Sequence, residues 1–290
     1  MGYESNQKKA DAAIDRSQDK FRHPTLLQAH KEADAFLNKE SIDPMDFLEL
    51  YGDDNVIRDL RKVDELKTKF EGDTSKIASR VFEAIMHQHI EQSNWLGANA
   101  RTIRTSEYDD FINGVDLVAT FRDEASMSHL ALGVDITFGS LSMQKKFDRI
   151  KNDIQNNKLA DVKYFEAPGY KGSLNQVPRV VIGVDIDKVI ALAGLWGRND
   201  NKSLAEHVTK DIIADEIEKQ VRAFMMFAKV QRKEEVAEAY SRAYNTIRKM
   251  HTVANGFSDE KNRMQVVHDD NVYKAIMEHL KFFTTSSRPG

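Results

Sequence analysis

The sequence predicts an α/β protein in which a sheet of short strands is flanked by helices on both sides along the chain. Apolar residues recur every three or four positions up to Gln92 and again from Asp187, which is the spacing of amphipathic helices. Between these regions the apolar segments are short or alternating, and Gly, Asp, Asn or Pro bound them, as is typical of strands. The expected order of the middle is therefore α-β-β-β-α-β, with one extra strand or extension.

Helices are expected before this sheet, in an N-terminal helical extension at residues 1–74. Residues 1–24 alternate charged and small side chains without an apolar stripe, so we expect a frayed or disordered start. Pro44 follows Ser-Ile-Asp, a turn and cap signature that suits the first turn of a helix. The helices expected in this extension cover residues 24–38, a segment from residue 44 and residues 55–70. The helix expected at residues 75–92 is the first element of the core.

The α/β core is expected at residues 75–198, and a C-terminal helical region at residues 199–290. The segments predicted as strands are 100–105, 115–121, 130–138, 162–165 and 177–184. Between the third and fourth strands, Met143 and Phe147 begin an apolar repeat at helical spacing within residues 140–157. The helices expected after the sheet cover residues 187–196, 203–230, 232–254 and 268–284.

The composition excludes several classes of protein. The chain has no cysteine, which excludes a disulfide framework, a cysteine nucleophile and thiolate-bound zinc. No apolar run approaches the ~20 residues of a membrane span, and the N-terminus lacks the apolar stretch of a signal peptide. We therefore expect a cytoplasmic protein with no membrane partner. The sequence also lacks the Gly-rich loops that bind nucleotides and the Gly-x-Ser-x-Gly turn of serine hydrolases.

The charges are divided unevenly along the chain, although the net charge is only −4. Residues 75–140 carry five Lys and Arg against nine Asp and Glu, whereas residues 141–179 carry eight against four. An acidic block next to a basic block is compatible with a metal-dependent site that acts on phosphate. The alternative is that both blocks are solvated faces without a common function.

Two aspartates are expected at one end of the sheet. Asp116 begins the second predicted strand, and Asp135 lies late in the third. If these strands form a hairpin, the start of one lies beside the end of the other, so the two carboxylates become neighbours. A carboxylate in an apolar strand is costly unless it is paired or bound to a cation, and Mg²⁺ prefers oxygen ligands. Alternatively, each aspartate caps a turn or pairs with Arg101, Arg104 or Arg122.

A helix that carries a glutamate is thus followed by a strand with Asp116, a strand with Asp135 and then Thr137, and a lysine-rich helix. This order resembles the core of the PD-(D/E)XK nuclease superfamily over about residues 75–190. The resemblance implies a restriction-endonuclease-like α-β-β-β-α-β core with a mixed sheet, flanked by N-terminal and C-terminal helices. Thr137 stands where the superfamily has its motif lysine.

In some branches of the superfamily the lysine comes from the next helix, where Lys145 and Lys146 lie in this chain. Lys146 flanks the apolar stripe of its helix and could reach back to the strand end, whereas Lys145 points farther away. The alternative for both is an ordinary solvated face. Glu83 fits the superfamily's helix acid because it lies within the first core helix. Glu91, in the last turn, is the other candidate, and for either the alternative is a surface glutamate.

The resemblance implies a metal-dependent nuclease that hydrolyses phosphodiester bonds in nucleic acid, with DNA favoured over RNA. The metal would be Mg²⁺ or Mn²⁺. The implied catalytic residues, of which the acids would also hold the metal, are Asp116, Asp135, Lys146 and Glu83. Those implied to contact the substrate are Lys145, Gln144 and Thr137. Those considered as outer participants are Asp110, from the acidic cluster at residues 107–110, and Glu91.

Two other functions stay open. Thr137 in place of the motif lysine favours a catalytically inactive PD-(D/E)XK-like protein that binds nucleic acid or acts as a scaffold. The dense apolar patch at residues 224–230 favours an assembly role, in which the C-terminal helices form a homodimer. Met and Phe at helical spacing are more often ordinary core, which is the alternative for that patch.

Overall fold

A computed structural model describes residues 20–69, 75–123, 126–134, 141–254 and 269–285. Asp135, Thr137 and the expected start at residues 1–19 lie outside these described residues. The described part is mixed α/β and mostly helical, with small sheets whose pairings are mainly antiparallel. None of its helices combines the length and the apolar character that crossing a membrane requires.

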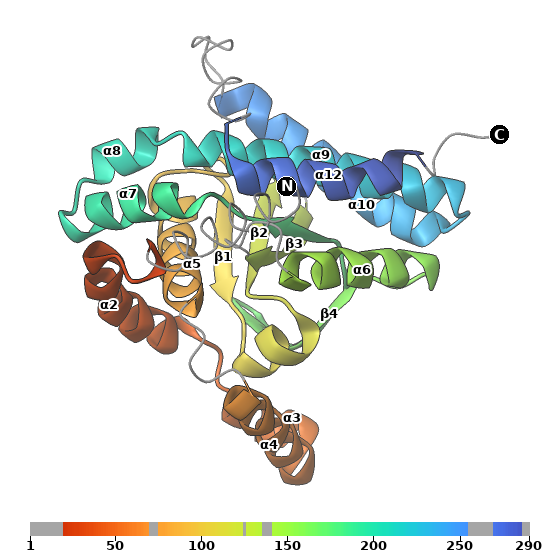
Figure 1. Cartoon of the computed structure of the whole chain (residues 1–290). Coiled ribbons are helices and arrows are strands. Elements are labelled where there is room, and N and C mark those ends of the chain that lie inside the picture. Colours follow the sequence, from red (N-terminus) through yellow and green to blue (C-terminus); the bar gives the residue numbers. More distant parts are fainter. Residues whose placement is uncertain (1–19, 70–74, 124–125, 135–140, 255–268, 286–290) are drawn as a thin grey trace, which may run out of the picture.

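A four-stranded sheet in the order β1-β2-β3-β6 lies at the centre of the fold (Figure 1). Its strands are β1 (Ala100–Arg104), β2 (Leu117–Asp123), β3 (Ser126–Val134) and β6 (Arg179–Ile182). The first three pair antiparallel in succession, and β3 pairs parallel with β6. The hairpin expected from the sequence is therefore present, and Leu117, which follows Asp116, pairs with Leu132.

Helices surround this sheet (Figure 1). α2, α5 and α7 lie on one side of it, α6 lies on the other, and α9 and α12 lie across its upper end. Their bounds are α2 (Pro24–Glu40), α5 (Ser75–Gln92), α6 (Leu141–Gln155), α7 (Ile186–Gly197), α8 (Asn201–Glu206), α9 (Thr209–Val230), α10 (Glu234–Ala254) and α12 (Asn271–Thr285).

One continuous hydrophobic core joins the sheet to these helices. Its buried residues come from the N-terminal, middle and C-terminal parts of the chain, and examples are Leu26, Val81, Leu117, Phe147, Phe224 and Phe283. In the apolar patch at residues 224–230, Phe224 and Phe227 are buried in this core, whereas Met226 and Val230 are exposed. The aromatic part of that patch therefore stabilises the monomer's own fold.

A second, two-stranded antiparallel sheet consists of β4 (Ala160–Ala167) and β5 (Tyr170–Val177). The segment predicted at residues 162–165 belongs to this second sheet, and the one at residues 177–184 is divided by Pro178 between β5 and β6. Hydrophobic periodicity does not indicate β5, because its residues are mostly polar. Pairing with β4, rather than a pattern of its own, places it in a strand.

The single helix predicted at residues 203–230 is two helices, α8 and α9. His207 between them has an extended backbone, with φ −66° and ψ 134°, which ends α8. Its Nδ1 accepts a hydrogen bond from the Thr209 backbone N–H at 3.3 Å and so supports the start of α9. A local cap of this kind does not change the hydrophobic period, so periodicity alone does not detect it.

Two polar side chains of α9 cover the open edge of β6. Gln220 accepts from the Val181 N–H at 2.9 Å and donates to the Val181 carbonyl at 2.5 Å. Glu216 Oε2 accepts from the Gly183 N–H at 3.1 Å, and burial raises the pKa of this carboxyl group well above its ordinary value. The backbone groups at the sheet edge are thereby satisfied within the molecule, which prevents edge-to-edge pairing with another chain.

A short helical turn, η2 (Asp109–Asn113), connects the two sheets. The fully buried Asp109 accepts hydrogen bonds from the backbone N–H groups of Lys163 at 2.7 Å and Tyr164 at 3.0 Å, both in β4. It also accepts from Ser106 Oγ at 2.8 Å and Asn113 Nδ2 at 2.6 Å. One carboxylate therefore fixes β4 against the turn that leads into β2.

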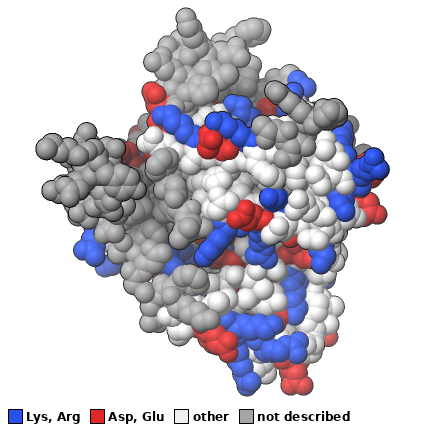
Figure 2. Space-filling model, turned by 45° about the vertical axis from the view of Figure 1, so that its right-hand side comes forward, with Lys and Arg blue, Asp and Glu red and all other residues white. Residues whose placement is uncertain are grey.

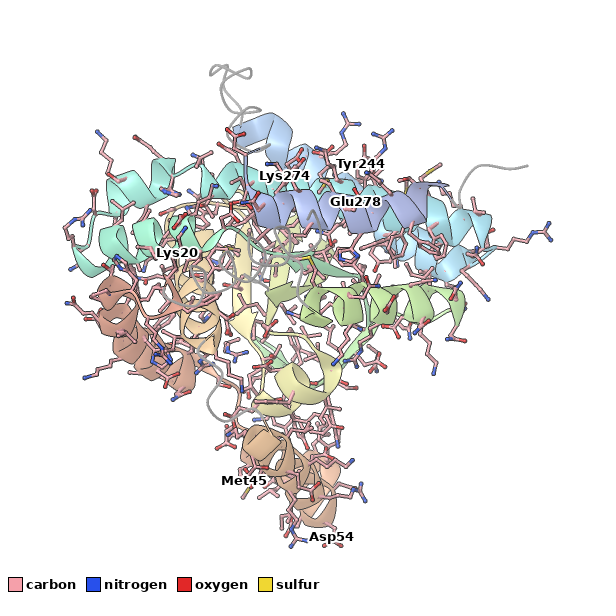
Figure 3. All side chains as sticks on the ribbon, viewed as in Figure 1. Lys20, Met45, Asp54, Tyr244, Lys274 and Glu278 are labelled. Carbon is pink, nitrogen blue, oxygen red and sulfur yellow. The ribbon has the colours of Figure 1, made fainter. Side chains whose placement is uncertain are left out.

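An arm of three short helical segments projects below the sheet (Figure 1). These segments are η1 (Pro44–Phe47), α3 (Leu48–Tyr51) and α4 (Asp53–Lys69), and Figure 3 labels Met45 and Asp54 on them. The arm is attached through Lys163, whose ammonium group pairs with the buried Asp59. The same ammonium group lies 5.2 Å from the ring centres of Tyr51 and Tyr164 and 5.5 Å from that of Tyr108.

Replacing Asp109 with alanine is expected to lower the free energy of unfolding by about 3 kcal/mol, because two buried backbone N–H groups lose a charged acceptor. Urea denaturation of both proteins measures the change. The matched control is Glu107→Ala two residues earlier, which removes only an exposed ion pair with Lys67 and should cost less than about 1 kcal/mol. Equal costs for the two variants would contradict this role of Asp109.

Candidate functional site

The candidate site is centred on Arg104, the last residue of β1, whose side chain is 1% exposed. Its Nε lies 2.7 Å from Glu83 Oε1 of α5. Its Nη2 donates to Asp110 Oδ2 of η2 at 3.1 Å, and its Nη1 donates to the backbone carbonyl of Asp116 at 2.7 Å. The guanidinium group therefore joins the helix, the turn and the entrance to β2 (the Arg104 cluster: Glu83, Arg104, Asp110 and Asp116).

The local structure explains why these residues meet. Side chains alternate along a strand, so Arg104 shares the inward face of β1 with the buried Ala100 and Thr102. Gly114 ends η2 with φ 64°, a left-handed conformation that favours glycine, and so reverses the chain between Asp110 and Asp116.

Two carboxyl groups of the Arg104 cluster, those of Glu83 and Asp116, resist ionisation. Burial raises the pKa of Glu83 to about 7, against the attraction of Arg104. Burial also raises the pKa of the half-buried Asp116 well above its ordinary value, and repulsion by Asp110 adds to the rise. The pKa of Arg104 stays above its ordinary value despite burial, because Glu83, Asp110 and Asp116 favour its charged form. The cluster thus holds more carboxyl groups than its single arginine can neutralise.

Lys146 adds a second cation to the Arg104 cluster. It lies on α6, where Met143 and Phe147 are buried in the core and hold the helix against the sheet. The charge of the half-buried Lys146 favours the ionised forms of both Asp116 and Glu83, in opposition to burial. This lysine therefore acts on the same carboxyl groups as Arg104.

The structure brings four of the proposed residues into one electrostatically coupled group. They come from α5, η2, the start of β2 and α6, and they are Glu83, Asp110, Asp116 and Lys146. Asp135 and Thr137 lie outside the described residues. The β2–β3 register pairs Leu117, next to Asp116, with Leu132. The expected proximity of Asp116 to Asp135 stays a prediction.

The remaining proposed residues lie elsewhere. Glu91 is in the last turn of α5, where its carboxylate pairs with the exposed Arg101 at 2.7 Å. Gln144 is exposed and donates to Asp148 Oδ1 at 2.9 Å, one turn along its own helix. Lys145 is exposed and lines a small hollow with Lys146. Glu83 rather than Glu91 is therefore the α5 acid in the Arg104 cluster.

The fit of the Arg104 cluster to a divalent cation is partial. Its carboxylates are the hard oxygen donors that Mg²⁺ and Mn²⁺ prefer, and their mutual repulsion is what a cation would relieve. Glu83, however, already has a cation at 2.7 Å, the Arg104 guanidinium. Within the ranges that the structure describes, no group of three His, Cys, Asp or Glu residues is arranged to hold a metal ion.

The sequence indicates Arg104 only as an alternative partner for the aspartates and does not place it at the centre of the site. Its position in the alternating pattern of β1 could have indicated it. Arg104 lies where that alternation predicts a buried side chain. Arg149 and Arg179, which lie near Gly114, were also missed. No local pattern could indicate them, because the elements that carry them are far apart in sequence.

In comparisons with known proteins, this chain matches no protein-family model, no curated protein and no solved structure.

Replacing Arg104 with methionine is expected to lower the free energy of unfolding by about 3 kcal/mol, because Glu83 then becomes an uncompensated buried acid. Adding Glu83→Gln should recover part of that loss, and a double-mutant cycle by urea denaturation measures the coupling. The matched control is the exposed pair Glu91 and Arg101 on the same two elements, with an expected coupling below about 1 kcal/mol. No coupling between Glu83 and Arg104 would contradict their assignment as a buried pair.

The raised pKa of Glu83 predicts a pH-dependent stability. Because the folded protein binds this proton more tightly than the unfolded chain, the contribution is present below pH 4.5 and is lost as pH rises through about 7. The loss amounts to about 3 kcal/mol. Urea denaturation between pH 5 and pH 8 should therefore show a steeper decline for the wild type than for Glu83→Gln. Parallel declines would show that Glu83 titrates normally in the folded state.

Proposed function

We propose that this chain is a metal-dependent nuclease that hydrolyses phosphodiester bonds, with DNA favoured over RNA. The observation that carries the proposal is the convergence of Glu83, Asp116 and Lys146 from three separate elements onto one site. Acidic groups and a lysine in this arrangement are suited to a cation and to the negative charge of a phosphate.

The order of elements supports a restriction-endonuclease-like core. α5 precedes the antiparallel strands β1, β2 and β3, α6 follows them, and β6 returns to pair parallel with β3. This matches the α-β-β-β-α-β order that the resemblance implies, with the β4–β5 hairpin as an insertion between α6 and β6. Lys146, on α6, would replace the superfamily's motif lysine, whose place at position 137 is occupied by threonine.

In this proposal the chain's own residues have distinct tasks. Asp116 would hold Mg²⁺ or Mn²⁺, with Asp135 and Glu83 as the further ligands. When bound, the metal lowers the pKa of a coordinated water and offsets charge on the scissile phosphate. Lys146 would orient the attacking water or neutralise charge that develops on the phosphate oxygens. Arg104 would be a positioning residue that holds the carboxylates of Glu83 and Asp110.

The nucleic acid would contact a local basic surface. On the face drawn in Figure 2, the coloured Lys and Arg side chains are interspersed with Asp and Glu side chains. Four of the eight basic residues at 141–179 line the hollow beside Lys146. Contacts to a few phosphates suit such a surface better than a long electrostatic track does.

A second candidate function is a catalytically inactive protein with the same core that binds nucleic acid or acts as a scaffold. The Arg104–Glu83 ion pair at 2.7 Å favours it, because an internal cation already occupies part of the acidic site. Thr137 in place of the motif lysine points the same way. Mn²⁺ binding discriminates between the two functions, since an inactive protein of this kind has no need of the ion.

The wild type is expected to cleave labelled single- or double-stranded DNA when Mg²⁺ or Mn²⁺ is present, and EDTA should abolish cleavage. Asp116→Ala and Lys146→Ala should each lower the rate by about 100-fold or more, because they remove a metal ligand and a charged catalytic group. Gel electrophoresis of the products, with RNA substrates in parallel, measures the rates.

The matched controls for these variants are Glu91→Gln on α5 and Asn152→Ala on α6, both outside the Arg104 cluster and expected to cleave at the wild-type rate. A folded wild type that cleaves none of these substrates and binds no Mn²⁺ would falsify the nuclease proposal and favour the inactive alternative.

A further inference from the structure

A small basic hollow adjoins the Arg104 cluster. Its volume is about 140 Å³, and four cationic side chains, a glycine and a valine line it: Lys145, Lys146, Arg149, Arg179, Gly114 and Val181. Lys146 belongs to the hollow and also acts electrostatically on Asp116, and Gly114 lies two residues before that aspartate. The hollow and the carboxylates are therefore parts of one continuous region.

The two arginines are held in place by the end of η2. Arg149 Nη2 donates to the Ile112 carbonyl at 2.9 Å, and Arg179 Nη1 donates to the Asn113 carbonyl at 2.9 Å. Carbonyl groups at the end of a helical turn carry partial negative charge, so they stabilise cations there. The guanidinium groups are thus fixed before any ligand binds, which lowers the entropic cost of binding.

Gly114 makes room for both guanidinium groups. A Cβ atom at this position would lie 3.1 Å from Arg149 Nη1 and 3.5 Å from Arg179 Nη1. Its backbone also has φ +64°, so a side chain there is both crowded and strained. Glycine at residue 114 is therefore required for the present shape of the hollow.

The two guanidinium groups of the hollow repel each other. Arg179 is 6% exposed and pairs with Asp153 at 2.8 Å, while its buried Nε has no hydrogen-bond partner among the described residues. Burial lowers the pKa of Arg179, and repulsion by Arg149 lowers it further. Four cations thus line the hollow, and the carboxylates that act on them include Asp153 and Asp161 at Arg179 and Asp116 at Lys146. A bound anion would reduce the remaining repulsion between the two guanidinium groups.

We propose that this hollow binds a single phosphate group of the nucleic-acid substrate, next to the site where a phosphodiester bond is cleaved. Planar guanidinium groups match the geometry of phosphate oxygens, and the volume is well below the roughly 300 Å³ or more of pockets that hold drug-sized ligands. The nucleic-acid source of the phosphate rests on the proposed function, whereas the anion site itself rests only on the residues above.

Inorganic phosphate is the first probe, titrated into the full-length protein in EDTA, with binding followed by ³¹P NMR line broadening. Wild-type protein should bind phosphate saturably, and Arg149→Gln should weaken binding by about tenfold because it removes one charged donor. Gly114→Ala should weaken binding as well, since it displaces the Arg149 guanidinium group. Arg242→Gln, which changes an exposed arginine on α10, is the matched control and should bind as the wild type does.

Circular dichroism melting of each variant confirms that it is folded. Absence of saturable phosphate binding in the wild type, or unchanged binding in folded Arg149→Gln, overturns the proposal. Oligonucleotides with and without a 5′-phosphate, tested in EDTA, then identify the source of the group. Tighter binding of the phosphorylated strand assigns the hollow to a terminal phosphate, whereas equal binding that Arg149→Gln weakens assigns it to an internal one.

Failure of the phosphate site and failure of the nuclease proposal give different results. Asp116→Asn is expected to bind phosphate normally and to cleave no DNA. Phosphate binding by a wild type that cleaves nothing preserves the hollow and removes the nuclease function. Cleavage that requires Asp116, together with unchanged phosphate binding in Arg149→Gln, preserves the nuclease and removes the hollow.

Discussion

The structure around the candidate site depends on the neutralisation of one buried guanidinium group, that of Arg104. An isolated charge in a protein interior costs several kcal/mol, so Arg104 must be surrounded by partners if β1 is to pack at all. Those partners are Glu83, Asp110 and the carbonyl of Asp116, which belong to three different elements. The requirement to compensate this arginine thus fixes α5, η2 and the start of β2 relative to one another, and it gathers acidic groups at one place.

The turn from Asp109 to Gly114 contacts several parts of the fold. Its neighbouring residues Asp109 and Asp110 bind different partners. Asp109 accepts a hydrogen bond from β4 of the second sheet, whereas Asp110 pairs with Arg104. The carbonyls that end the turn hold Arg149 and Arg179, and Gly114 leaves space for both. One short segment therefore connects the second sheet, the carboxylates and the basic hollow. A change in its backbone would alter the geometry of all three.

The proposed function depends on a balance among the same charges. Arg104 and Lys146 favour ionised carboxylates, while burial and the repulsion between Asp110 and Asp116 oppose ionisation. A divalent cation would relieve that repulsion, and in this sense the Arg104 cluster is suited to a metal-dependent nuclease. The internal pair between Arg104 and Glu83 competes with such a cation, which is why the inactive alternative has a physical basis.

The sequence by itself determined the α/β order of elements, the β2–β3 hairpin and the amphipathic helix that carries Lys146. These features depend on local periodicity, which a single segment expresses without help from the rest of the chain. Only the tertiary structure decided that the polar β5 is a strand, that Glu83 rather than Glu91 joins Arg104, and that Gly114, Arg149 and Arg179 form a hollow. Each of these depends on contacts between residues distant in sequence, and on burial that changes the energy of a charge, so local spacing could not reveal them.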